Sequence, residues 1–216
     1  GDEDTAIALN IDAALADGLG ALSSITISDI PEGSVISIGT DGSGNPITVD
    51  VVNGVAVLTP DQLVNAAITP PVNFGDDFAL SVTAEREIGF TSAPATLTVN
   101  VSPVADAPDV TVSSDNIFVE GGQNATFDLS AVTTDTSENI SEVQVSGIPD
   151  GAKLFIPVGD GSVTVQLPVI NGVATIPISL VDSVIIQTAE GYNADYDLVV
   201  SATSKETDGG DTATTS

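Results

Sequence analysis

The chain has 216 residues, enough for one large domain or for two of about 100 residues each. Its 3 basic and 31 acidic residues give a formal net charge of −28 at pH 7. That charge excludes a nucleic-acid-binding surface and disfavours anionic membranes, because both present negatively charged phosphates. Hydrophobic residues make up 42% of the chain, largely in short alternating runs, so the acidity does not indicate disorder.

Export and membrane signals are sparse in the sequence. No apolar run reaches the roughly 18 residues of a membrane-spanning helix, so we expect no membrane insertion. Residues 1–4 lack the basic and apolar regions of a signal peptide, so the chain is expected to be a piece of a longer one. There is no cysteine, which excludes disulfides and is compatible with bacterial secretion.

Short strands and turns account for the first half of the chain. An Ile-Pro-Glu-Gly segment at 30–33 has turn composition, and Asn53-Gly54 is a strong hairpin signal. Only short windows such as 59–67 allow a helix, because Gly, Pro and β-branched residues interrupt the rest. The alternation of apolar and polar residues predicts strands at 24–28, 47–52, 55–58, 78–84 and 95–101.

The same pattern returns 118 residues further along the chain. Ile30 has its counterpart in Ile148 and Asn53 in Asn171, each within a similar four-residue segment. Because one offset holds through several separated segments, we infer an internal duplication. The second copy opens with a predicted strand near residues 107–112 that the first copy has no room for. Its other predicted strands are 142–146, 163–170, 173–176 and 196–202.

About seven short strands per hundred residues, with turns at regular spacing, are typical of a Greek-key sandwich. We therefore predict an all-β protein of two tandem immunoglobulin-like (Ig-like) β-sandwich domains. The boundary falls near Asp106, which gives one repeat over residues 1–105 and another over residues 106–216.

Catalytic chemistry has little support in the composition. Without His or Cys, a Ser-His-Asp triad, a Cys-His pair and ordinary zinc sites are excluded, and no phosphate-binding glycine loop occurs. A carboxylate hydrolase would need two acids facing one pocket. Among so many acids close pairs arise by chance, so the chain is predicted not to be an enzyme.

Oxygen-rich calcium sites fit the composition better, because Ca²⁺ takes six to eight oxygen ligands from carboxylates, carbonyls and water. The predicted site lies at the joint between the copies. Glu85 and Glu87 directly follow the strand at 78–84. Because they are two residues apart, their side chains should point to the same side, and we expect both near the linker. The other interpretation is that these acids are simply solvated. The predicted ligands are Glu3, Glu85, Glu87, Asp106, Asp109, Asp135 and Glu138.

Several segments resemble the Ig-like or cadherin-like repeats of giant bacterial RTX-type adhesins. They lie at residues 3–7, 22–27, 30–33, 69–74, 101–108 and 207–211. The resemblance implies an extracellular extender on a bacterial cell surface, stiffened by Ca²⁺ at its joints and projecting a distal binding region for adhesion and biofilm formation. Its expected partners are neighbouring repeats of the same chain, and the chain is expected to be monomeric. The second copy departs from the pattern, with Glu-Gly-Gly-Gln at 120–123 in place of Glu-Asp-Thr-Ala at 3–6.

A ligand-binding module of the same kind of adhesin is the alternative function. Its loops would hold a sugar, a peptide or a host receptor, and its signature would be an exposed aromatic cleft. Phe90, Phe118 and Phe155 have no aromatic counterpart in the other copy and are the candidates for such a cleft. The acidic turns at Asp41 and Asp160 are interpreted as hairpin tips, whereas 208–211 is compatible with either a Ca²⁺ site or a flexible loop.

Overall fold

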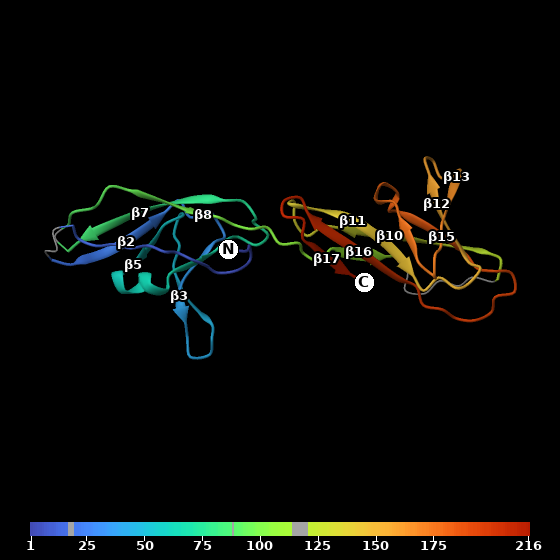
Figure 1. Cartoon of the computed structure of the whole chain (residues 1–216), viewed down its shortest axis with the longest axis horizontal. Helices are drawn as coiled ribbons and strands as arrows, with labels where there is room; N and C mark the ends of the chain where they lie inside the picture. Colours follow the sequence, from blue (N-terminus) through green and yellow to red (C-terminus); the bar gives the residue numbers. More distant parts are fainter. Residues whose placement is uncertain (17–19, 88, 114–120) are drawn as a thin grey trace. The chain divides into compact units, whose positions relative to one another are not determined.

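The computed structural model describes residues 1–16, 20–87, 89–113 and 121–216 (Figure 1). The chain divides into two compact units, Gly1–Val104 and Ala105–Ser216, each with its own hydrophobic core. The described residues form strands and two short 3-10 helices, which confirms the all-β prediction. Neither of these helices is long and apolar enough to cross a membrane.

The first unit is built from two four-stranded antiparallel sheets, in the orders β1-β6-β3-β4 and β5-β2-β7-β8. A short 3-10 helix, η1, occupies the window in which the sequence allowed a helix. Its elements are β1 (Ile7–Ala8), β2 (Leu22–Ser28), β3 (Val35–Thr40), β4 (Pro46–Val49), β5 (Ala56–Leu58), η1 (Pro60–Asn65), β6 (Ala67–Thr69), β7 (Phe78–Arg86) and β8 (Ala95–Val99).

The second unit has a five-stranded sheet, β13-β12-β15-β10-β9, and a four-stranded sheet, β14-β11-β16-β17. Strand β9 is the predicted opening strand, and it pairs with β10 at Leu129↔Val112. The elements are β9 (Asp109–Val112), β10 (Asn124–Val132), β11 (Glu138–Ser146), β12 (Lys153–Val158), β13 (Val163–Leu167), β14 (Ala174–Ile176), η2 (Ile178–Leu180), β15 (Ser183–Gln187), β16 (Val199–Glu206) and β17 (Thr212–Thr215).

Both units have immunoglobulin-like strand order. In the second unit β9, β10, β15 and β12 occupy the places of strands A, B, E and D, and β11, β16 and β17 those of C, F and G. The first unit repeats B-E-D with β1, β6 and β3 and repeats C-F-G with β2, β7 and β8. The fold class is therefore the predicted Ig-like Greek-key sandwich.

The core of each unit follows from strand alternation. Ile25 and Ile27 in β2, and Val143 and Val145 in β11, lie two residues apart and point inward, and all four are fully buried. The offset of 118 residues also holds in the strand pairing, because Ile25 faces Ala84 exactly as Val143 faces Ala202. The duplication inferred from sequence is thus present in the hydrogen-bonding register.

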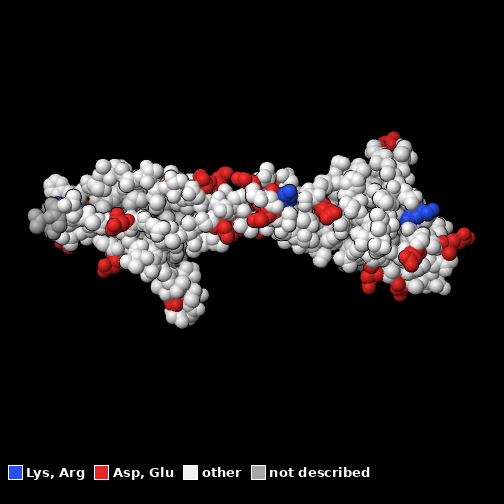
Figure 2. Space-filling model, viewed as in Figure 1, with Lys and Arg blue, Asp and Glu red and all other residues white. Residues whose placement is uncertain are grey.

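Acidic side chains are spread over the surface of each unit, with few cations among them (Figure 2). Arg86, Lys153 and Lys205 are the only basic side chains in the sequence. Few side-chain cations are therefore available to compensate the charge of acids that are buried together.

Candidate functional site

The site begins in the turn that precedes β11 of the second unit. The Oδ1 atom of Asp135 accepts hydrogen bonds from the backbone N–H of Ser137 (2.9 Å) and of Glu138 (3.2 Å), and from the Ser137 hydroxyl (2.8 Å). An aspartate that accepts from the backbone two residues on closes an Asx turn. This turn sets the direction in which β11 starts and places Glu138 at its first position.

Strand pairing brings a third acid to this turn. Glu138 and Glu206 are directly opposite each other in the β11–β16 register, where two like charges are destabilising. The Ser137 hydroxyl lies 3.1 Å from Oε1 of Glu206 as well as 2.8 Å from Asp135. A hydroxyl has one proton to donate, so two carboxylates compete for a single donor.

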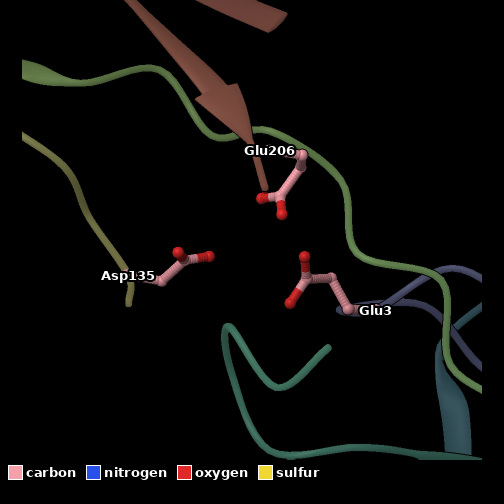
Figure 3. A group of neighbouring side chains, drawn as sticks. All are labelled: Glu3, Asp135 and Glu206. Carbon is pink, nitrogen blue, oxygen red and sulfur yellow. The ribbon is translucent and has the colours of Figure 1, made fainter. Parts of the chain in front are cut away.

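Asp135, Glu138 and Glu206 are hereafter called the acidic cluster. Glu138 is 3% exposed and Glu206 2% exposed, while Asp135 is half-buried. One buried oxygen of Asp135 (Oδ2) and one of Glu206 (Oε2) have no hydrogen-bond partner among the described residues. Figure 3 shows the carboxylates of Asp135 and Glu206 directed into the same space. An ionised carboxylate loses its hydration on burial, and in these two oxygens no hydrogen bond within the described residues replaces the lost contacts with water.

The electrostatics of Glu206 reflect this crowding. Burial raises the pKa of Glu206 most, and the charges of Asp135 and Glu138 raise it further, against a hydrogen bond from Ser137 that lowers it. Lys205 is the neighbouring cation in sequence, but it is exposed because successive strand residues alternate between the two faces. The cluster therefore gathers negative charge without compensation from that lysine.

The acidic cluster also holds the start of the second unit. Oε2 of Glu138 accepts the backbone N–H of Asp106 (3.1 Å), and the Ser204 hydroxyl donates to the Asp106 carbonyl oxygen. Oε1 of Glu138 lies 3.3 Å from the backbone nitrogen of Thr134. Three predicted ligands, Asp106, Asp135 and Glu138, are thus brought together, although Asp106 enters these contacts through its backbone.

In the first unit Glu3 ties down the end of the domain. Oε1 of Glu3 accepts the backbone N–H of Val104 at 2.7 Å, and its own N–H donates to the carbonyl of Ser102. Nearby, Oδ1 of Asp77 accepts the N–H of Val101 at 2.8 Å. Glu3 therefore contacts the last residue of its unit, as its predicted place beside the linker requires.

The predicted position of Glu85 and Glu87 beside the linker is wrong. Phe78, at the start of β7, pairs with Val99, whereas Glu85 lies at the other end, opposite Ser24 and bridged to Thr91. Because β7 and β8 are antiparallel, the residues that follow β7 lie at the opposite end from those that follow β8. Glu85 and Glu87 are consequently at the end of the first unit that is remote from Val104.

Asp109 is not brought into the acidic cluster by any contact of the described residues. It is exposed at the first position of β9, with its backbone paired to Val132.

Glu206 was not predicted from the sequence, although the sequence contains a signal for it. Side chains two residues apart on a strand point to the same face, and Ala202 and Ser204 of this strand are both buried. The alternation of the strand therefore places Glu206 on the buried face as well.

The acidic turns at Asp41 and Asp160 are hairpin tips, as interpreted from sequence, because they join the paired strands β3 and β4 and the paired strands β12 and β13. The Asp41 carboxylate accepts from the backbone N–H groups of Ser43 and Asn45 and from the Asn45 side chain, and these bonds lower the pKa of Asp41. Asp160 accepts from the backbone and hydroxyl of Ser162, which likewise lower its pKa. These carboxylates are already satisfied by their own turns.

Aromatic side chains give weak support to a ligand cleft. Phe74 packs edge-on against Phe78, with ring centroids 6.0 Å apart, and Tyr192 against Tyr196 at 5.7 Å. Phe90 is 68% exposed in the loop after β7, whereas Phe155 is half-buried. Phe118 lies outside the described residues.

No protein-family model matches the chain, and no curated protein matches it. Among solved structures it is similar to the D00-D0 domain of intimin, with 14% identity over 98% of this chain and 90% of that chain and a TM-score of 0.34. Domains 4 and 5 of the S-layer protein SbsC give 14% identity over 89% and 96% of the two chains, with a TM-score of 0.28. Murine CEACAM1b gives 9% identity over 90% and 89%, with a TM-score of 0.21. At these identities and TM-scores the likenesses assign no function to the chain.

Proposed function

We propose that the chain is an extender module of a large secreted bacterial surface adhesin, and that Ca²⁺ bound by the acidic cluster stiffens the joint between its two units. The observation that carries the proposal is the buried Glu206, whose Oε2 atom has no hydrogen-bond partner among the described residues and which faces Asp135. A divalent cation would supply the missing compensation for both carboxylates.

The donor set suits Ca²⁺ better than other biological metals. The side chains of the acidic cluster offer carboxylate oxygens, and one oxygen of Asp135 lies within 4.8 Å of one of Glu206. Ca²⁺ accepts six to eight oxygens in flexible geometry. Zinc and copper prefer His or Cys ligands, and the chain has neither residue. The carboxylates of Asp135 and Glu206 leave room for backbone carbonyls and water to complete a calcium shell, whereas Mg²⁺ demands stricter octahedral geometry.

A role at the joint is supported by the hydrogen bonds of the connecting residues. Val104 N–H is held by Glu3 within the first unit, and Asp106 N–H by Glu138 within the second, two residues further along the chain. A cation that fixes the Glu138 carboxylate would also fix the backbone that it binds. Calcium would in this way restrict the freedom of the linker, which is what an extender requires.

The repeated Ig-like architecture and the lack of His and Cys favour a structural role over catalysis. Neighbouring repeats of the same chain are the proposed partners, with the molecule monomeric and extracellular.

A ligand-binding module is the second candidate function, and the exposed Phe90 is the observation that favours it. A specific hit on a glycan or peptide array that is lost in Phe90→Ala would support that candidate.

Adding Ca²⁺ to the EDTA-treated chain is expected to raise the unfolding temperature of the second unit. At a free Ca²⁺ concentration 100 times the Kd, a ligand bound only to the folded state stabilises it by about 2.7 kcal/mol, or roughly 10 °C for a domain of this size. Differential scanning calorimetry of the full chain measures the shift.

A double variant, Glu138→Gln with Glu206→Gln, should lose most of the calcium response. The matched control, Glu85→Gln with Glu87→Gln, changes the same number of charges at the far end of the first unit and should keep it. A thermal scan that Ca²⁺ leaves unchanged in the unaltered chain would contradict the proposal.

A further inference from the structure

Strand β9 covers one edge of the second unit. It pairs antiparallel with the last four residues of β10, from Val112 against Leu129 to Asp109 against Val132. The side chain of Val110 packs against the hydrophobic core, and β9 also contacts β16 of the opposite sheet. The strand therefore joins the two sheets on this side of the unit.

The corresponding edge of the first unit carries no such strand among the described residues. The offset of 118 makes residues 11–14 the counterpart of residues 129–132. In the first unit β1 is the outermost strand of its sheet, and only its two residues, Ile7 and Ala8, are paired. Strand β10, its counterpart, is nine residues long because β9 continues the pairing on its outer edge.

The unpaired segment after β1 already has the side-chain alternation of a strand. Leu9, Ile11 and Ala13 are buried or half-buried, and the residues between them are exposed. Ile11 packs against the core of the first unit but is only half-buried, whereas its counterpart Leu129 is 4% exposed. The segment is therefore oriented as β10 is, without the cover that β10 has.

An open groove lies beside this segment. It has a volume of about 210 Å³ and is lined by residues 7–10 of one sheet edge and by residues 97–100 of the other, with Gly1 at its border. The groove thus lies between the outer strands of the two sheets, on the side that β9 joins in the second unit.

The backbone direction at this edge follows from the hydrogen bonds of the second unit. The N–H of Leu129 donates to Asp182, beside β15, whereas the carbonyl of Asp128 accepts the N–H of Ser113, beside β9. Because backbone groups alternate along a strand, Ser130 faces β9, opposite Thr111.

The same alternation applies to the first unit. The N–H of Leu9 donates to the carbonyl of Ala66, beside β6, so the backbone of Asp12, the counterpart of Ser130, is directed to the open edge. The backbone of Asp12 forms no hydrogen bond with another described residue. Donors and acceptors for an added strand are therefore in place.

We propose that residues 10–14 of the first unit are an acceptor edge for one extended strand, supplied by the linker of a neighbouring repeat and carrying an apolar residue that enters the groove as Val110 does. The inference rests on the proposed function, because an extender places repeats one after another. In the second unit the strand on this edge follows directly from the linker at 105–108, so the chain itself shows this source. Strand addition to an open edge uses main-chain hydrogen bonds for affinity and alternate side chains for specificity. A linker in the same chain also has a high effective concentration.

An added strand tests the acceptor edge. A second copy of residues 105–118, fused before Gly1 of the full chain, keeps the offset of 118 because Gly1 is the counterpart of Val119. In hydrogen–deuterium exchange with EDTA, peptides covering 9–16 are expected to exchange about tenfold more slowly than in the unextended chain. Peptides covering 138–146 in the second unit are expected to be unchanged.

The matched control is the same extension with Val110→Asp in the added copy only. It keeps the length and the backbone but places a charge in the groove, so it should give little protection. Equal protection by both extensions, or protection by neither, would overturn the inference. The calcium response of the second unit, measured on the same samples, is independent of this result, and its absence would overturn the proposed function instead.

Asp12→Pro tests the acceptor side of the pairing. Proline has no N–H, so it cannot form the hydrogen-bonded pair that Ser130 makes with Thr111. The extension should slow exchange by less than about twofold in this variant and by the full amount in Asp12→Ser, which keeps the N–H. Full protection in the Pro variant would overturn the assigned edge, and the comparison of the two extensions on the unaltered chain decides the matter should that variant not fold.

Discussion

Replacing Leu154 by Ala is expected to destabilise the second unit by about 3–5 kcal/mol. Leu154 is fully buried in β12 and packs in the core of the second unit. The substitution removes buried methyl groups and leaves a cavity that the two sheets cannot close, so both the transfer and the cavity contributions are lost. Urea unfolding of the full chain measures the change in free energy.

Val165→Ala is the control on the neighbouring strand of the same sheet. Val165 lies in β13, faces Ile156 in the register, and is 46% exposed, so its truncation should cost less than about 1 kcal/mol. The unfolding transition of the first unit should not move in either variant, because its core is a separate set of residues. Equal losses in the two variants would show that the assigned core is wrong.

Local turn chemistry made much of the fold predictable from sequence. The Asn-Gly pairs at 53–54 and 171–172 have positive φ at both residues, as a tight two-residue hairpin requires, and Val52 pairs with Val55 across the first of them. Such signals depend on a few adjacent residues, so they can be recognised in a single sequence. The duplication strengthened them, because each turn occurs twice.

The candidate site was only partly predictable, because it depends on strand direction and strand parity. Glu85 and Glu87 were placed at the linker from their position in the sequence, but antiparallel pairing carries them to the remote end. Glu206 joined the cluster through cross-strand pairing with Glu138, a contact across 68 residues of sequence that no local pattern contains. Asp135 and Glu138 were found because one short turn contains both.

In EDTA, the free energy of unfolding of the second unit is expected to fall as pH rises from about 4.5 through the raised pKa of Glu206. Above its ordinary value of 4.5, the folded state keeps the proton longer than the unfolded state does, so the folded state binds more protons in this window. Stability therefore decreases with rising pH, by at most about 1.4 kcal/mol per pH unit for one proton. Asp160, in the same unit, has a lowered pKa, so its contribution has the opposite sign and is confined to pH values below its ordinary pKa of 3.8. Saturating Ca²⁺ should reverse the trend, since the metal binds the ionised carboxylate.

Glu206→Gln should remove both the fall in stability with rising pH in EDTA and its reversal by Ca²⁺. If this variant and the unaltered chain have the same pH profile in EDTA, Glu206 is not the group responsible.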